Sequence, residues 1–573
     1  MSSFHSVFSA LLLYAACNVA AVPVHEKAIS SPAVTIKNGT CSGLYSPEYN
    51  QDYFLGIPFA QPPVGDLRFR NPQHVNSSFA GTYFATKYSS ECIGYTSDQW
   101  NYQISEDCLY LNVVRPAGYE NTSLPVAFWI HGGGYIAGGG LDQRYNLSFI
   151  VQNSVRIGKP MIGVSINYRL SAWGFLSSLQ VSGSGNTNMG LKDQRLALRW
   201  VQENIAAFGG DTKKVTIWGE SAGASSVGLQ LTAYGGRDDN LFRAAIMQSG
   251  NPVYYNGFGR TNTYQSLYDE IITQAGCANS TDSLQCLRGV TYGTLNAIFN
   301  GTTTVNGSSL NAWGPVIDGD FIQKFTSLQL QNNAFVHVPI LSGANSDEGT
   351  AFSPTGINST EDFYNSITSS TRTAPAPAAL ASALLDAYPD DPSVNVIASL
   401  GPNFRPGSPY GAQYRRSASY YGDLIFIANR RLTCQVWAAA NVPAYCYRFN
   451  TIPAGVNQIS GVTHFQEIGF VFLNTQGVGY PPISVNPFTN KSESFIRLAM
   501  FMDSSWISFV SDLDPNAWRS AWNGSEALWP VYDMNNPQNI VFDANVTSYA
   551  EPDTYRDKGM RLINQNNAGV YNR

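Results

Sequence analysis

Charged side chains are scarce in this chain: Asp, Glu, Lys and Arg make up 13% of its 573 residues, about half of the usual share. Uncharged polar residues must therefore form much of the solvent-exposed surface. The formal net charge of −6 comes without a basic stripe, which argues against a nucleic-acid partner.

Long hydrophobic runs are also lacking. An apolar run over residues 7–16, followed by small residues up to Ala21, predicts a secretory signal peptide over residues 1–21. No later segment reaches about 18 apolar residues, and the C-terminal residues are polar, so we expect no membrane or lipid anchor. A secreted, extracellular protein is the simplest interpretation. The sequence does not indicate an oligomeric state.

Cysteine is sparse, with eight residues, of which Cys17 would leave with the signal peptide. Short separations along the chain favour two disulfides, Cys92–Cys108 and Cys277–Cys286, with Cys434–Cys446 as a weaker third pair. Cys41 would then be a free thiol. Eleven Asn-x-Ser/Thr sequons offer acceptors for N-glycosylation in a secreted protein.

Apolar strand-like runs alternate with helical patterns along the chain. The strand-like runs cover 124–130, 161–167, 215–218, 243–248, 336–342 and 443–449, and the helical patterns cover 189–208, 222–231 and 378–385. This order predicts an α/β fold with a large, mostly parallel sheet flanked by helices on both faces. We find no internal repeat and no dividing linker, so we expect residues 22–573 to form one domain.

The most informative motif is Gly219-Glu220-Ser221-Ala222-Gly223, which joins the run 215–218 to the helical segment 222–231. A serine between such a strand and helix is held in a strained turn with its hydroxyl exposed. Ser221 is therefore the predicted nucleophile. An ordinary Gly/Ser turn is the alternative for the motif taken alone.

A serine nucleophile needs a base, and the chain has only six histidines. His5 and His25 lie in or just after the signal, His74 is expected in a solvated loop, and His337, inside an apolar strand-like run, is expected in the core or at a strand edge. His131 precedes three glycines. The order Ser, acid, His along the chain makes His464 the predicted base.

The acid should lie between Ser221 and His464. Asp347 and Glu348 follow the predicted strand 336–342, so either would lie at the carboxyl edge of the sheet. Asp318 and Asp320 compete with them, although we interpret both as turn carboxylates. The residues alone do not separate Asp347 from Glu348.

Donors for a developing oxyanion are predicted where His131 is followed by Gly132-Gly133-Gly134-Tyr135. Glycines let the backbone approach a ligand closely and point its N–H groups at it. The amides of Gly133, Gly134 and Ala222 would form the oxyanion hole. A flexible loop is the alternative for the glycines alone.

These motifs resemble the type-B carboxylesterase family, which includes cholinesterases and fungal lipases of the Geotrichum and Candida rugosa type. The resemblance starts near Lys37 and is carried by residues 52–60, 105–112, the triple glycine and 219–223. It implies an α/β-hydrolase fold in which one catalytic domain has insertions that form a gorge. It places the acid on Glu348 and the base on His464, with Ser249 as a hydrogen-bond partner behind them.

The resemblance also implies that Arg68 and Glu106 form a structural salt bridge. Phe465 departs from the many relatives that have glycine after the histidine, and this change would reshape the pocket wall. The implied reaction is hydrolysis of a small-molecule ester through an acyl-enzyme. No metal or cofactor is expected, because the sequence has no His-Glu-x-x-His, cysteine cluster or dinucleotide fingerprint.

Within this family, the segment between Cys92 and Cys108 corresponds to the flap of the fungal lipases, and here it is short. A short flap has little apolar area to open at an oil surface, so we favour an esterase over a lipase for longer-chain acylglycerols. Trp100 and Tyr135 are the predicted gorge residues, and Trp100 could hold a cation as in cholinesterases. A non-catalytic adhesion protein is a remote alternative, because Ser221, Glu348 and His464 are all present.

Overall fold

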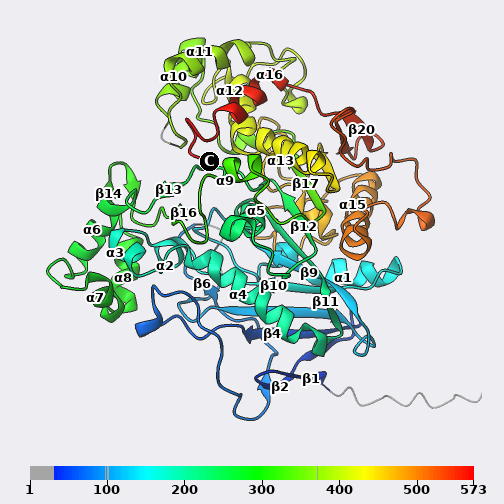
Figure 1. Ribbon diagram of the computed structural model, residues 1–573. Helices are drawn as coiled ribbons and strands as arrows, with labels where there is room; N and C mark the ends of the chain where they lie inside the picture. Colours follow the sequence, from blue (N-terminus) through cyan, green and yellow to red (C-terminus); the bar gives the residue numbers. More distant parts are fainter. Residues whose placement is uncertain (1–30, 97–98, 100–101, 371) are drawn as a thin grey trace, which may run out of the picture.

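The computed structural model describes residues 31–573 except 97–98, 100–101 and 371 (Figure 1). The expected signal peptide and Trp100 lie outside the described residues. Within the described residues the largest sheet has eleven strands. In spatial order these are β20 (Tyr549–Pro552), β19 (Gln538–Phe542), β18 (Ala444–Phe449), β17 (Ile340–Asn345), β12 (Ala244–Gln248), β11 (Gly210–Glu220), β9 (Leu124–Ile130), β10 (Ile162–Ile166), β8 (Tyr110–Pro116), β4 (Gln51–Pro58) and β3 (Leu44–Ser46).

Every neighbouring pair from β19 to β10 in this order is parallel. The strands at both margins of the sheet pair antiparallel. Short strands outside it are β1 (Ala33–Ile36), β2 (Gly39–Ser42), β5 (Tyr83–Phe84), β6 (Glu91–Cys92), β7 (Ile104–Ser105), β13 (Gly259–Arg260), β14 (Thr304–Val305), β15 (Ser308–Ser309) and β16 (Val316–Ile317).

Helices cover the sheet and extend beyond it (Figure 1). They are α1 (Leu147–Arg156), α2 (Ser171–Phe175), α3 (Leu179–Gly183), α4 (Met189–Asn204), α5 (Ala222–Gly236), α6 (Gln265–Gln274), α7 (Ser283–Gly289), α8 (Tyr292–Phe299), α9 (Thr326–Gln331), α10 (Thr360–Thr368), α11 (Ala378–Ala387), α12 (Tyr414–Gly422), α13 (Ala428–Ala439), α14 (Ile468–Val471), α15 (Glu493–Asp512) and α16 (Asp557–Gln565). A π-helical stretch, η7 (Asp423–Ile427), joins α12 to α13.

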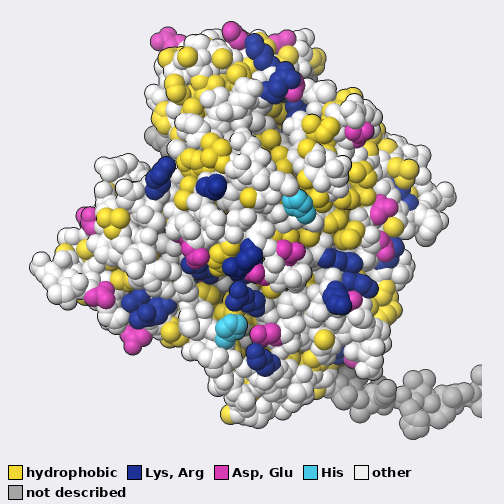
Figure 2. Space-filling view, in the orientation of Figure 1, with side chains coloured by type: hydrophobic (Ala, Val, Ile, Leu, Met, Phe, Trp, Pro, Cys, Tyr) yellow, Lys and Arg dark blue, Asp and Glu magenta, His cyan; other side chains and the backbone are white. Residues whose placement is uncertain are grey.

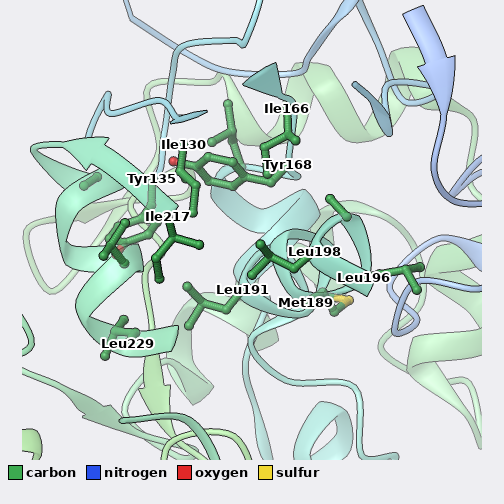
Figure 3. Packing of buried hydrophobic residues seen from close by; sticks show 14 of the residues in the cluster. Ile130, Tyr135, Ile166, Tyr168, Met189, Leu191, Leu196, Leu198, Ile217 and Leu229 are labelled. Atoms are coloured by element: carbon green, nitrogen blue, oxygen red, sulfur yellow. The ribbon is translucent and has the colours of Figure 1, made fainter. Parts of the chain in front are cut away.

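Two hydrophobic cores lie on opposite faces of the sheet, because successive side chains of a strand point to opposite sides. On β9, Phe128 and Ile130 pack into the core that contains residues of α4 and α5, part of which Figure 3 shows. Ala127 and Trp129, which alternate with them, pack into the core that contains residues of α1 and α15. This double burial explains why the central strands are apolar along their whole length.

A third core lies beyond the sheet, among residues of α10, α11, α12, η7 and α16. These helices gather at one end of the molecule (Figure 1). The helical pattern expected at 378–385 is α11, inside this group. Through this core η7 is packed against β17 of the central sheet.

The strand expected over 336–342 begins only at Ile340. Residues 336–339 form a loop, and His337 is exposed there with its ring 4.5 Å from that of Phe335. The expectation that His337 lies in a strand or in the core was therefore wrong. The apolar residues around it, Val336 and Val338, are buried without joining a strand.

The surface matches the low charge content, because Figure 2 shows charged side chains scattered between broad uncharged areas. Cys92–Cys108, Cys277–Cys286 and Cys434–Cys446 form disulfides, and Cys41 is a buried free thiol. In the part of the chain that the structure describes, no helix combines the length and apolarity that a bilayer crossing demands.

Candidate active site

Ser221 lies in the sharp turn between β11 and α5. Its backbone angles, φ 56° and ψ −123°, are rare for a residue with a side chain. The turn fits against β9 because Gly223 lacks a Cβ, which would lie 2.0 Å from the carbonyl oxygen of Ile130. The motif therefore presents the serine hydroxyl at the carboxyl edge of the sheet, where open α/β sheets bind ligands.

The side chains of Ser221, His464 and Glu348 form one continuous hydrogen-bonded row. The distance from His464 Nε2 to Ser221 Oγ is 2.8 Å, and that from His464 Nδ1 to Glu348 Oε2 is 2.6 Å. Glu348 is fully buried in the turn after β17, whereas Asp347 beside it makes no contact with the imidazole. The structure thus brings together the three residues that the resemblance selected.

The carboxylate of Glu348 is held by two donors from neighbouring strands. The hydroxyl of Ser249, just after β12, donates to Glu348 Oε1 at 2.5 Å, and the backbone N–H of Asn345 donates to the same oxygen at 2.8 Å. These bonds fix the orientation of the carboxylate that faces the imidazole. Ser249 thus occupies the supporting place that the resemblance implied.

Two further carboxylates act electrostatically on the imidazole, and no role was predicted for either from the sequence. Glu220, next to the serine, places Oε1 3.3 Å from His464 Nε2. Glu467 is fully buried and accepts from the amides of Asn345 and Gln248. Burial opposes the charged imidazolium, but the carboxylates of Glu348, Glu220 and Glu467 outweigh it and raise the pKa of His464 to about 9.

Aromatic rings enclose the other faces of the imidazole. The ring of Phe426, from the π-helical stretch η7, stacks on His464 with centroids 4.8 Å apart. Phe352 meets the same ring edge-on at 5.1 Å. A π-helical turn shifts the side chains that follow it around the helix axis, and such turns are frequent at functional sites.

A cavity of about 490 Å³ opens above the serine. Its walls combine aromatic, glycine and polar residues: Thr96, Gly132, Gly133, Gly134, Ile136, Gly138, Arg144, Tyr145, Glu220, Ser221, Tyr255, Asn256, Phe352, Arg372, Phe426, His464 and Phe465. Phe465, which departs from the family pattern, forms part of the wall, and the guanidinium of Arg144 lies 4.7 Å from its ring centroid.

The expectation for Tyr135 as a gorge residue was wrong. Its side chain is fully buried behind the glycine loop and does not line the cavity, and Figure 3 shows it within the packed apolar core. Its ring packs against those of Phe175 and Tyr254. Trp100, the other predicted gorge residue, lies outside the described residues.

The glycine loop, residues 132–134, lies beside the nucleophile. Gly133 and Gly134 line the same cavity as Ser221 and have φ values of +95° and +65°. A Cβ on Gly133 would lie 2.2 Å from the carbonyl oxygen of Ala137, so only glycine fits there. Ala222 opens α5, and the first N–H groups of a helix have no acceptor within it.

The remaining predicted residues lie away from the nucleophile. Arg68 and Glu106 form a bidentate salt bridge with N–O distances of 2.5 and 2.8 Å. Asp318 accepts the backbone N–H groups of Asp320 and Ile322, as a turn carboxylate does. Neither aspartate lines the cavity.

A serine, an imidazole and a buried carboxylate in this geometry, at the carboxyl edge of a mostly parallel sheet, define a hydrolase of the α/β-hydrolase class. The imidazole can take the serine proton while the carboxylate stabilises the resulting imidazolium.

Comparison with known proteins identifies the family. The sequence profile of the carboxylesterase family matches residues 30–559, and the chain belongs to that family. It is 35% identical to Secreted lipase 1 of Botryotinia fuckeliana (strain B05.10), over 96% of this chain and 95% of the relative. It is 32% identical to Lipase 2 of Geotrichum candidum, over 89% and 91% of the two chains.

Among solved structures, that of EstA from Aspergillus niger superposes with a TM-score of 0.79. The alignment has 28% identity and covers 95% of this chain and 99% of that chain. The fold is therefore the α/β-hydrolase fold, and the protein is a carboxylic ester hydrolase.

Proposed function

We propose that the protein cleaves carboxylic esters through an acyl-enzyme on Ser221. His464 takes the hydroxyl proton as Ser221 attacks the ester carbonyl, and Glu348 stabilises the imidazolium. His464 then protonates the leaving alcohol, and a water molecule repeats the sequence to release the acid. The single observation that carries the proposal is the unbroken row from Ser221 Oγ through both nitrogens of His464 to Glu348.

The tetrahedral oxyanion is stabilised in this proposal by the amides of Gly133, Gly134 and Ala222. The support is their position, since the two glycines line the cavity beside Ser221 and Ala222 begins the helix that follows it. Loss of one such donor typically costs about 3–4 kcal/mol of transition-state stabilisation.

The substrates that we propose are esters in solution with short acyl chains. Polar groups of Thr96, Asn256 and Arg372 interrupt the apolar lining of the cavity. A long alkyl chain packed against them would desolvate polar groups without pairing them, which is unfavourable. The short segment between Cys92 and Cys108 adds support, because it offers little apolar area for contact with an oil surface.

A lipase acting on longer-chain acylglycerols is the second candidate, and the names of relatives favour it. The relatives from Botryotinia fuckeliana and Geotrichum candidum are both called lipases. Rates on butyrate and oleate esters, measured below and above the solubility limit of each, separate the two candidates. A sharp rise at the interface with preference for oleate would establish the lipase and reject our preference.

The proposed nucleophile is tested by covalent labelling with a fluorophosphonate probe. Wild-type protein should be labelled stoichiometrically, and the peptide that contains Ser221 should carry the label. Ser221→Ala should lose both labelling and turnover while its circular dichroism spectrum is unchanged. A labelled, active Ser221→Ala protein would reject the assignment.

We also propose that the protein is secreted after removal of residues 1–21, leaving residues 22–573 as one catalytic domain. The support is that two relatives are named as secreted, from Botryotinia fuckeliana and Gibberella zeae. N-terminal sequencing of the protein from culture medium tests this proposal. A mature N-terminus at Met1 would reject it.

A further inference from the structure

The turn that carries Glu348 and the loop that carries His464 are joined by a dense set of hydrogen bonds. The hydroxyl of Thr350 lies 2.6 Å from the carbonyl oxygen of Ser460 and 2.8 Å from the hydroxyl of Thr463. The side-chain amide of Asn345 donates to the carbonyl of Thr463 at 2.8 Å. Residues 345–350, the acid turn, and residues 460–464, the histidine loop, therefore behave as one unit.

Asp347 lies at the centre of this unit and binds both backbone groups of Val462. Its own N–H donates to the Val462 carbonyl at 3.0 Å, and its Oδ2 accepts the Val462 N–H at 2.8 Å. Val462 precedes His464 by two residues. The side chain of Asp347 is fixed closely, because a Cβ on Gly461 would lie only 2.3 Å from Oδ2.

We propose that Asp347 is a positioning residue of this enzyme, whose side chain holds the histidine loop by the Val462 amide and so keeps His464 between Glu348 and Ser221. The proposal rests on the proposed catalytic roles of those three residues. Asp347 makes no contact with the imidazole itself, so it acts on catalysis only through the loop.

The acceptor oxygen, and not the negative charge, is the part of Asp347 that this role requires. Asp347 is almost completely buried, and within the part of the chain that the structure describes its second carboxyl oxygen, Oδ1, has no hydrogen-bond partner. Burial raises the pKa of its carboxyl to about 7. A neutral carboxyl still presents a carbonyl oxygen to the Val462 N–H, and an asparagine side chain would present the same oxygen.

Loss of that oxygen should slow the chemistry without weakening substrate binding. The Val462 N–H would be left buried without an acceptor, which favours a shift of the loop. A displacement of about 1 Å between reacting groups can lower a rate by about 100-fold. Asp347 does not line the cavity, so the Michaelis constant should change little.

The test compares Asp347→Ala with Asp347→Asn in steady-state assays on a soluble butyrate ester. We expect Asp347→Ala to lower kcat by about 10- to 100-fold with KM within about two-fold of wild type. Asp347→Asn should restore most of kcat. Asp503→Asn is the matched control, because it changes another buried carboxyl, on α15, and should leave both constants unchanged.

If Asp347→Ala does not fold, Gly461→Ala tests the same contact from the other side. The added methyl group would press against Oδ2 of Asp347, and the positive φ of residue 461 is strained for alanine. A folded Asp347→Ala enzyme with wild-type kcat would overturn the inference, and so would an Asp347→Asn enzyme as slow as Asp347→Ala. Wild-type protein that is not labelled at Ser221 would instead reject the proposed function. The two failures are therefore distinguishable.

Discussion

The carboxylate of Glu220 should control the pH at which the enzyme becomes active. The enzyme requires a neutral imidazole, so kcat/KM rises with pH as the His464 imidazolium loses its proton. Because neighbouring carboxylates raise the pKa of His464 to about 9, we expect wild-type activity to increase into the alkaline range. The substitution Glu220→Gln keeps the shape of the side chain and removes one of these charges.

The size of the effect follows from the 3.3 Å between Glu220 Oε1 and His464 Nε2. Coulomb's law gives about 1.3 kcal/mol at a dielectric constant of 80 and about 5 kcal/mol at an effective value of 20. One pKa unit corresponds to about 1.4 kcal/mol, so these energies bracket a fall in the pKa of His464 of about one to three and a half units. The acid limb of the pH profile should move to lower pH by the same amount.

The assay is kcat/KM for a soluble butyrate ester between pH 5 and 10, with the rate of fluorophosphonate labelling as a second reporter of the free enzyme. Glu467→Gln is the matched control, because Glu467 is equally buried but contacts Asn345 and Gln248 instead of the imidazole. Its limb should move less than that of Glu220→Gln. An acid limb that stays in place in Glu220→Gln, or moves to higher pH, would refute the electrostatic reasoning.

Three further substitutions test other parts of the structure. Ser249→Ala removes a hydrogen bond to a buried carboxylate, worth about 1.5–3 kcal/mol, and should lower kcat/KM by about 10- to 100-fold; unchanged kinetics would contradict the supporting role. Gly223→Ala forces a methyl group against the carbonyl of Ile130 and should prevent folding, so a soluble variant with wild-type circular dichroism would contradict the close packing. Asp553→Ala removes the carboxylate that the buried Arg430 and Arg431 share, and it should lower the free energy of unfolding by about 3–5 kcal/mol in urea titrations. A loss under about 1 kcal/mol would contradict the importance of this buried ion pair.

The sequence predicted the framework of the fold well because its central strands are buried on both faces. Continuous apolar runs such as 124–130 are clearly predicted as strands when glycines and helical patterns flank them. The loop at 336–339 was mistaken for a strand, because Val336 and Val338 are buried by packing against the core and not by pairing in the sheet.

For the site, local motifs indicated the serine turn and the glycine loop, whereas the acid depended on a family resemblance. Asp347 and Glu348 are adjacent carboxyl residues, and which of them faces the imidazole depends on contacts with residues far along the chain. The aromatic wall from Phe426 was not predictable for the same reason, since a π-helical turn sets its direction. Glu220 lies inside the serine motif and Glu467 lies three residues after His464, and these positions were the available signal.

The three reacting residues, Ser221, Glu348 and His464, follow β11, β17 and β18 respectively. These positions become neighbours through the parallel pairing β11–β12–β17–β18. A register error of two residues in any one of these pairings would carry a side chain about 7 Å out of reach. Active-site titration with an organophosphorus reagent therefore measures the fraction of molecules whose sheet has assembled correctly. Refolding yields of this enzyme could be read from that titration alone, without a spectroscopic signal.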